Sequence, residues 1–162
     1  MKKVNEELRY DGATIQQVHE MLGDEAFRGR VCDAQGVLRH TVTIDAAGEA
    51  MTVKIDQIQE AQGIPGFAKK FIGDEINIVQ SEDWTAPEKG NITVVIPGKP
   101  GEMSGTALLT EDPDGTTETV NMQVKVNIPV VGGRIEGFIA DMLRKALHAE
   151  NREGIDWLAG KR

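Results

Sequence analysis

The sequence predicts an α+β fold in which a seven-stranded antiparallel sheet carries a long C-terminal helix across one face. Three observations predict it. Most of the chain alternates apolar and polar residues with the period of two that is typical of strands. Gly- and Pro-rich segments divide this region into hairpins, whose strands are antiparallel. The last strand then runs through Pro129–Gly133 into a helical pattern that reaches Leu158, and such a helix needs a sheet to cover.

The chain begins with a strand and two short helices. Residues 4–10 alternate apolar and polar side chains, which predicts a strand. Thr14 is placed to cap a helix over residues 15–22, with Gln17 at the capping-box position. Asp24 is placed to cap a second short helix directly afterwards.

Six further strands follow, and turn residues separate most of them. They are expected at residues 38–44, 51–55, 76–84, 92–96, 103–109 and 120–128. The segment Glu60–Gly73 breaks the pattern and is expected as a long loop. Because alternate connections of an antiparallel meander lie at the same end of a sheet, this loop shares one end with Pro97–Gly101 and Pro129–Gly133.

The C-terminal segment predicts one long amphipathic helix. From Gly133 to Leu158, at about 1.5 Å per residue, it would approach roughly 40 Å. Gly154 is a position where the helix could end early or kink. Its continuous apolar stripe is formed by Ile135, Phe138, Ile139, Met142, Leu143, Ala146 and Leu147.

The Gly- and Pro-rich end of the sheet is where we expect a cavity between sheet and helix to open. Its mouth is expected near Phe67, Phe71, Pro97 and Gly132. The alternative is that Phe67 and Phe71 fill a small core beneath their own loop. Gly132 opens the helix, whose free amides could bind an anion; the simpler account is that it permits the sharp turn from strand to helix.

Composition excludes several classes of function. A length of 162 residues predicts a single domain over residues 1–162. The net charge of −8 has the wrong sign for binding nucleic acid. No apolar run approaches the roughly 20 residues of a membrane span, so no integral membrane association is expected. The N-terminal segment lacks the apolar core of a signal peptide, which predicts a cytoplasmic protein.

Three polar residues at core-facing positions are weak catalytic candidates. His40 shares a strand face with Val42 and could orient a ligand or act as an acid or base; the alternative is a hydrogen-bonded core histidine. Gln80 and Glu82 share the parity of Ile78, so either they are polar groups of a cavity or a bulge turns them outward. Glu82 with His40 could form an acid/base pair, because an apolar cavity raises the pKa of a carboxyl group.

No motif predicts a metal or a cofactor. The sequence contains no Cys-x-x-Cys, His-x-His or His-Glu-x-x-His pattern, and no phosphate-binding Gly-x-x-x-x-Gly-Lys-Ser/Thr loop. Cys32 is the single cysteine, which excludes an internal disulfide. It has no basic motif beside it and is expected to be a buried structural thiol.

Three segments carry a resemblance to a known family: Ile64–Glu75 (IPGFAKKFIGDE), Ile96–Gly101 (IPGKPG) and Ile128–Gly137 (IPVVGGRIEG). With the order of elements, they resemble a bacterial branch, catalogued as a domain of unknown function, of the START-like or SRPBCC superfamily. That superfamily has the helix-grip fold and includes birch-allergen-like proteins, polyketide cyclases and lipid-transfer domains. The resemblance implies a curved sheet and a deep apolar cavity that binds a lipid, a polyketide or a similar molecule, and it transfers no catalytic position.

We therefore expect the chain to bind or carry a small hydrophobic molecule between the sheet and the C-terminal helix. One alternative is an enzyme of the cyclase or hydrolase kind that uses His40, Gln80 or Glu82 in the same cavity. Another is a non-catalytic partner protein with a solid core. The expected cavity wall consists of Val42, Met51, Val53, Ile78, Val94, Met103, Val124, Phe138 and Met142.

Overall fold

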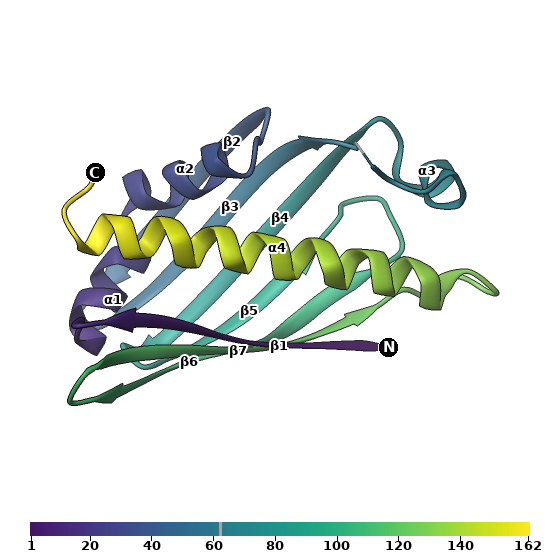
Figure 1. Ribbon diagram of the computed structural model, residues 1–162. Helices are drawn as coiled ribbons and strands as arrows, with labels where there is room; N and C mark the ends of the chain where they lie inside the picture. The colour runs from purple at the N-terminus through teal and green to yellow at the C-terminus, as the bar shows by residue number, and fades with distance from the viewer. Residues whose placement is uncertain (62) are drawn as a thin grey trace.

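The computed structural model describes residues 1–61 and 63–162, and within them it confirms the predicted α+β architecture (Figure 1). Seven strands form one antiparallel sheet in the order β1-β7-β6-β5-β4-β3-β2. The strands are β1 (Lys2–Asp11), β2 (Arg39–Ala47), β3 (Ala50–Glu60), β4 (Glu75–Ala86), β5 (Lys89–Val95), β6 (Glu102–Asp112) and β7 (Gly115–Lys125). The helices are α1 (Ile15–Leu22), α2 (Glu25–Ala34), α3 (Gly66–Ile72) and α4 (Gly132–Leu158).

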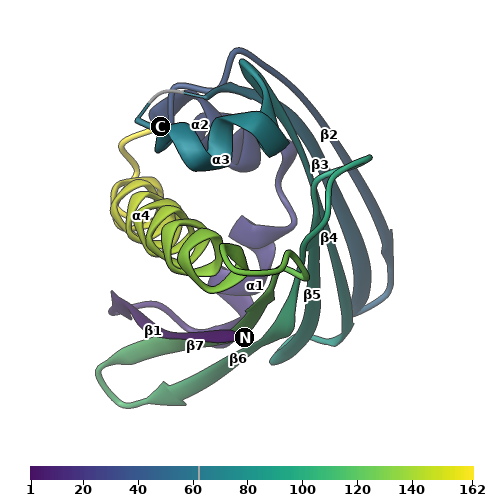
Figure 2. The same ribbon diagram turned by 90° about the vertical axis from the view of Figure 1, so that its right-hand side faces the viewer.

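The sheet curves around α4, with β1 and β2 as its two edges (Figure 2). Consecutive strands from β2 to β7 pair as antiparallel neighbours, and β1 closes the order by pairing with β7, from Lys2 opposite Val124 to Asp11 opposite Gly115. The connections alternate between the two ends as predicted. We call the end with α3, the β5–β6 turn and the start of α4 the loop end, and the end with α1 and α2 the helix-pair end (Figure 1).

Both short N-terminal helices begin at the predicted caps. The Thr14 hydroxyl accepts the Gln17 amide at 3.1 Å, and the Gln17 side chain accepts the Thr14 amide at 2.9 Å, which completes the capping box. Asp24 Oδ1 accepts the amides of Ala26 and Phe27 at 2.8 and 3.4 Å. These bonds fix where α2 begins and therefore which of its side chains face the interior.

The long helix α4 continues through Gly154 to Leu158 without ending early. A Cβ at Gly154 would lie 2.7 Å from Cε1 of Tyr10, so the glycine lets the ring of a β1 residue pack directly beneath the helix. At the other end of α4, a Cβ at Gly132 would lie 2.5 Å from the carbonyl oxygen of Val126. Only glycine therefore fits where the chain turns from β7 into α4.

The segment predicted as a long loop after β3 contains the short helix α3. Its seven residues make about two turns, too few to show a 3.6-residue period, and Pro65 precedes them without a side-chain cap. Gly73, at φ 85°, ends the helix in the left-handed region that favours glycine. Gln62, inside the predicted loop Glu60–Gly73, lies outside the described residues.

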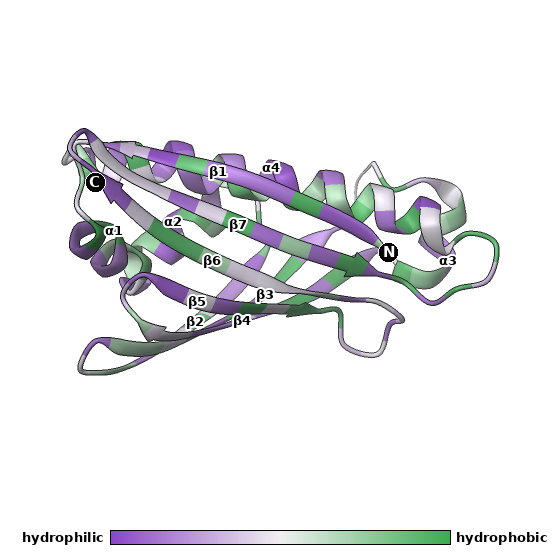
Figure 3. Cartoon of the chain, turned by 90° about the horizontal axis from the view of Figure 1, so that it is seen from below, coloured by the Kyte–Doolittle hydropathy of each residue, from purple (hydrophilic) through white to green (hydrophobic). Residues whose placement is uncertain are grey.

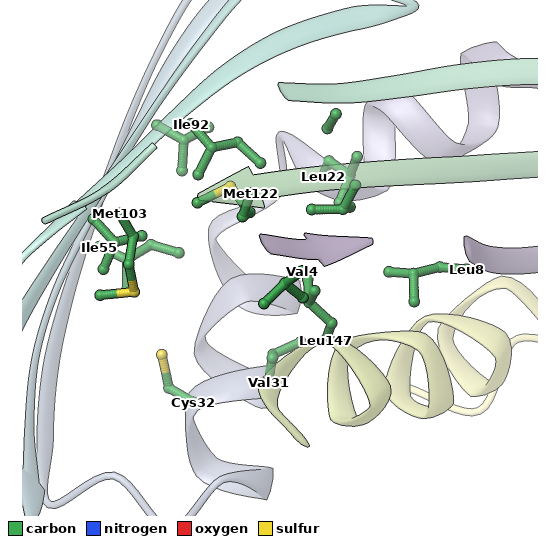
Figure 4. Close-up of a cluster of buried hydrophobic side chains, with 14 of the residues drawn as sticks. Val4, Leu8, Leu22, Val31, Cys32, Ile55, Ile92, Met103, Met122 and Leu147 are labelled. Carbon is green, nitrogen blue, oxygen red and sulfur yellow. The ribbon is translucent and has the colours of Figure 1, made fainter. Parts of the chain in front are cut away.

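The alternating pattern along the strands turns one face of the sheet inward. Figure 3 shows hydrophobic and hydrophilic residues following one another along β1, β6 and β7. Val120 and Met122 of β7 are among the buried set. In Figure 4, Cys32 of α2 points toward the same interior space as Ile55 and Met103 of the sheet. Within the described part of the chain, no helix is long and apolar enough to cross a membrane.

Candidate ligand-binding cavity

A cavity of about 550 Å³ lies between the concave face of the sheet and the helices α2 and α4. The alternative of a partner protein with a solid core predicts that no such cavity exists. Its volume falls in the range of about 300–1,000 Å³ that is usual for small-molecule sites. The apolar wall includes Val31, Cys32, Ile55, Ile72, Ile76, Ile78, Ile92, Val94, Ile96, Met103, Val120, Met122, Phe138, Ile139, Met142 and Leu143.

Five of the nine predicted wall residues line this cavity: Ile78, Val94, Met103, Phe138 and Met142. The other four belong to the packed interior. Met51, Val53 and Val124 are buried in the hydrophobic core, and Val42 is half-buried on the edge strand β2. Parity identifies the inner face of the sheet, but the helices cover parts of that face directly. Met51 shows this, because a Cβ at Gly23 beside α1 would lie 2.9 Å from its sulfur atom.

The predicted mouth residues all lie at the loop end. Phe67 and Phe71 are half-buried on α3, and the guanidinium carbon of Arg134 lies 4.1 Å from the centre of the Phe67 ring. Pro97 is exposed in the β5–β6 turn, and Gly132 is buried in the first turn of α4. Their neighbours Ile72 and Ile96 line the cavity. A mouth at this end stays a prediction.

His40 lies elsewhere. It is exposed on the edge strand β2, where its Nδ1 is 3.9 Å from a carboxylate oxygen of Asp33, and its Nε2 faces Gly29 of α2. Its parity does point it to the same face as Val42, but α2 covers that part of the face. The predicted pair of His40 with Glu82 is therefore not formed.

Gln80 and Glu82 face the cavity, so the alternative of an outward-turning bulge before them is wrong. The pairing of β4 with β5 is regular from Val79 through Trp84, and its irregularity comes only between Trp84 and Ala86. Both side chains line the cavity toward the helix-pair end. They belong to a polar cluster that we call the inner cluster: Arg28, Gln80, Glu82, Glu118 and Glu150.

Glu82 is the best-satisfied member of the inner cluster. Its two carboxylate oxygens accept bonds from Arg28 Nη1 at 2.9 Å and Nη2 at 2.7 Å, a bidentate arrangement. Trp84 Nε1 donates at 2.8 Å and Gln80 Nε2 at 2.6 Å. Burial alone would raise the pKa of Glu82, but the Arg28 charge and these bonds hold it below 4.5. Glu82 is thus an ionised anchor for Arg28.

Arg28 is buried and most of its donors are engaged within the protein. Its Nε donates to the carbonyl oxygen of Leu22 at 2.7 Å, and both terminal nitrogens donate to Glu82. Nη1 also lies 3.8 Å from a carboxylate oxygen of Glu150. The guanidinium therefore ties α2 to β4 and lies near α4.

Glu118 is the unsatisfied member of the inner cluster. It is buried on β7, and its Oε1 has no hydrogen-bond partner among the described residues. Burial, followed by the nearby charges of Glu150 and Glu82, raises the pKa of Glu118 well above its ordinary value. Burial likewise raises the pKa of Glu150 to about 7, against the lowering effect of Arg28. Tyr10 lies beside them, and burial with the charge of Glu118 raises its pKa as well.

Sequence reasoning overlooked Arg28, Glu118 and Glu150, although each occupies a core-facing position. Arg28 falls between Phe27 and Val31 on the buried stripe of α2. Glu118 shares the inward parity of Val120 on β7. A charged residue in a buried stripe is the signal that could have found all three.

No group of three or more His, Cys, Asp or Glu side chains in residues 1–61 and 63–162 could hold a metal ion. Cys32 lines the cavity, and burial raises the pKa of its thiol to about 11. At neutral pH the sulfur is therefore a thiol and a weak nucleophile.

One family model and two mycobacterial proteins match most of the sequence. The sequence model of the family described as "Protein of unknown function (DUF2505)" matches residues 6–158. An uncharacterized protein of Mycobacterium tuberculosis is 25% identical over 161 residues, which cover 92% of each chain. A second uncharacterized protein, from Mycobacterium bovis, matches with the same identity and coverage.

Solved structures with low sequence identity share the fold. The protein TTHA0849 from Thermus thermophilus has a TM-score of 0.69 at 12% identity, over 99% of both chains. The di-domain ARO/CYC BexL from the BE-7585A biosynthetic pathway has a TM-score of 0.65 at 15% identity, over 96% of this chain and 49% of that one. Ara h 8.0201 has a TM-score of 0.61 at 7% identity, over 96% of this chain and 98% of that one.

Proposed function

The chain belongs to the DUF2505 family, and we propose that it binds and carries a small hydrophobic molecule in the cavity between the sheet and α4. The observation that carries the proposal is the cavity itself, about 550 Å³ with an apolar wall. Emptying such a wall of water on binding is favourable, at roughly 25 cal/mol per Å² of apolar surface covered.

The proposal includes membership of the START-like superfamily. Two short helices after β1 and a long C-terminal helix across a curved sheet form the helix-grip arrangement. The folds shared with an ARO/CYC protein and with Ara h 8.0201 support this assignment.

A cavity-filling substitution tests the proposal. Val94 lines the cavity from β5, whereas its neighbour Thr93 is exposed on the opposite face. We expect Val94→Trp to abolish the fluorescence gain of N-phenyl-1-naphthylamine, an uncharged apolar probe, and Thr93→Trp to leave it unchanged. Equal probe binding by both variants, or no binding by the unmodified protein, contradicts the proposal. Native mass spectrometry of the purified protein provides a second readout through any retained ligand.

A cyclase- or hydrolase-type enzyme is the second candidate, and one observation favours it. Glu150 has a pKa of about 7 inside an apolar cavity, which suits a general acid or base at neutral pH. Glu118 and Glu150, rather than the fully bonded Glu82, would then be the acid/base groups. Hydrolysis of p-nitrophenyl octanoate should rise with pH around 7 and be lost in Glu150→Gln. An unchanged rate in that variant contradicts catalysis by this group.

A further inference from the structure

The buried charged groups of the cavity are concentrated at its helix-pair end, whereas the uncharged Gln57 and Gln59 of β3 line it nearer the loop end. Charged groups line this end from four elements: Arg28 on α2, Glu82 on β4, Glu118 on β7 and Glu150 on α4. The rest of the wall is mainly aliphatic. A long ligand would therefore have its two ends in different surroundings.

The inner cluster offers a poor receptor for an anionic headgroup. Arg28 is the only buried cation among the described residues that line the cavity, and Glu82 neutralises it through two short bonds. A carboxylate placed here would face Glu118 and Glu150 without a free buried positive charge. Burying a charge without a free counterion is strongly unfavourable, whether or not the neighbouring carboxyl groups are protonated. The other basic side chains that border the cavity are exposed on α4: Lys145, His148 and Arg152.

Glu118 has a hydrogen-bonding atom in the cavity wall that no protein group in the described part of the chain uses. Its Oε1 is buried with no hydrogen-bond partner among the described residues, and the side chain lines the cavity. An unmet buried polar atom is costly, so a ligand group that bonds to it gains affinity. A hydroxyl suits this site in either protonation state of the carboxyl group, because a hydroxyl both donates and accepts.

We infer that the cavity selects apolar molecules with an uncharged hydroxyl at one end, which bonds to Glu118 while the apolar body extends toward Ile72 and Ile96 at the loop end. The inference rests on the proposed function, and it names the chemical class of the ligand. Anionic amphiphiles such as fatty acids should bind weakly, because Glu82 already neutralises Arg28 and their charge would be buried without a counterion.

Three amphiphiles of equal chain length test this selection. 1-Decanol, decanoate and decylammonium compete with N-phenyl-1-naphthylamine at pH 6, where Glu150 is mostly protonated, since its pKa is about 7. We expect decanol to displace the probe with a Kd about tenfold or more below those of both ions, the effect of one buried hydrogen bond and an unpaired charge. Equal displacement by decanoate overturns the selection, and tightest displacement by decylammonium replaces it with a cation site.

A variant isolates the role of Glu118. Glu118→Leu removes the bonding group, so the Kd of decanol relative to that of the probe should rise about tenfold. An unchanged ratio of the two Kd values overturns the role of Glu118 even though the cavity binds. If the probe fails to bind the unmodified protein, the proposed function fails, and the inference falls with it.

Discussion

The two ends of the cavity differ in how closely they are packed and in how much charge they bury. At the helix-pair end, packing is close and charges are buried. Trp84 and Tyr10 are fully enclosed, and the missing side chain of Gly154 leaves room for the Tyr10 ring. At the loop end, α3 and α4 both begin without a side-chain cap, and Val130 is 100% exposed. The first end fixes the positions of polar groups, whereas both helices at the second end begin without the side-chain caps that fix α1 and α2. Regions of low local stability are where binding proteins usually open.

The helix-pair end contains its own contrast, between Glu82 and Glu118. Both are buried carboxyl groups on core-facing strand positions of one cavity. Glu82 accepts four hydrogen bonds, whereas Glu118 Oε1 accepts none from the described residues. A buried acid with partners holds elements together, and a buried acid without them is open to a ligand that supplies the missing bond.

The largest effect is expected at Arg28. Arg28→Met leaves the Glu82 carboxylate buried without its counterion, which should lower the free energy of unfolding by about 3–5 kcal/mol. Urea denaturation measures the change. The double variant Arg28→Met/Glu82→Met removes both charges and should recover most of the loss. A loss below about 1 kcal/mol in the single variant contradicts the anchoring role, since that is the value of an exposed pair.

Substitution of Glu118 should have the opposite effect to that of Arg28 and raise the free energy of unfolding. A free glutamate titrates near 4.5, and burial raises the folded-state pKa, so between these values the folded protein holds a proton that the unfolded chain has lost. Stability from this group is therefore present below pH 4.5 and is lost as pH rises. Glu118→Gln removes the titration and should stabilise the protein by about 1–3 kcal/mol at pH 8.

At pH 4 the same variant should differ little from the unmodified protein. Thermal unfolding at both pH values, reported as the difference between the two proteins, checks the prediction. A difference that does not change with pH shows that Glu118 has an ordinary pKa.

The close packing of α4 can be compared at two glycines of the same helix. Gly154→Ala forces a methyl group to within 2.7 Å of the Tyr10 ring and should cost about 1–3 kcal/mol. At Gly137, nearer the loop end, a Cβ meets no atom within 4 Å. Gly137→Ala should therefore stabilise the protein by about 0.5–1 kcal/mol through helix propensity. Chemical denaturation of both variants checks the signs, and equal signs contradict the difference between the ends.

The smallest effect is expected at Val130. This β-branched residue has φ 72°, in the left-handed region that glycine occupies without strain. Val130→Gly should stabilise the protein by about 0.5–1 kcal/mol, the strain relieved less the entropy of glycine in the unfolded chain. Val131→Gly is the matched control: Val131 has φ −104°, so glycine there should destabilise. Destabilisation by Val130→Gly as large as that by Val131→Gly means that the strain is absent.

Most of the fold could be predicted from the sequence because its signals are local. Strand alternation, the caps at Thr14 and Asp24, and the turn residues each act within a few positions of the chain. The helix α3 could not be predicted in this way, since about two turns are too short to reveal a period.

Less of the candidate site could be predicted from the sequence, for two physical reasons. Parity placed Gln80 and Glu82 on the inner face but could not show that α2 covers the face at His40. The inner cluster joins residues from four segments, and Arg28 meets Glu82 only through tertiary packing. The sequence shows that Arg28 and Glu150 are charged residues on buried stripes, but it does not show which residues they contact.

The pairing of β1 with β7 has a consequence for how the molecule is made. β1 is made well before its partner β7, because Lys2 pairs with Val124, and α4 then covers β1. Bringing such distant segments together costs chain entropy before their contacts form, and this makes such folds slow to form. Until β7 has been made, β1 has no partner strand, and the cavity between the sheet and α4 is complete only after both of these late segments have folded.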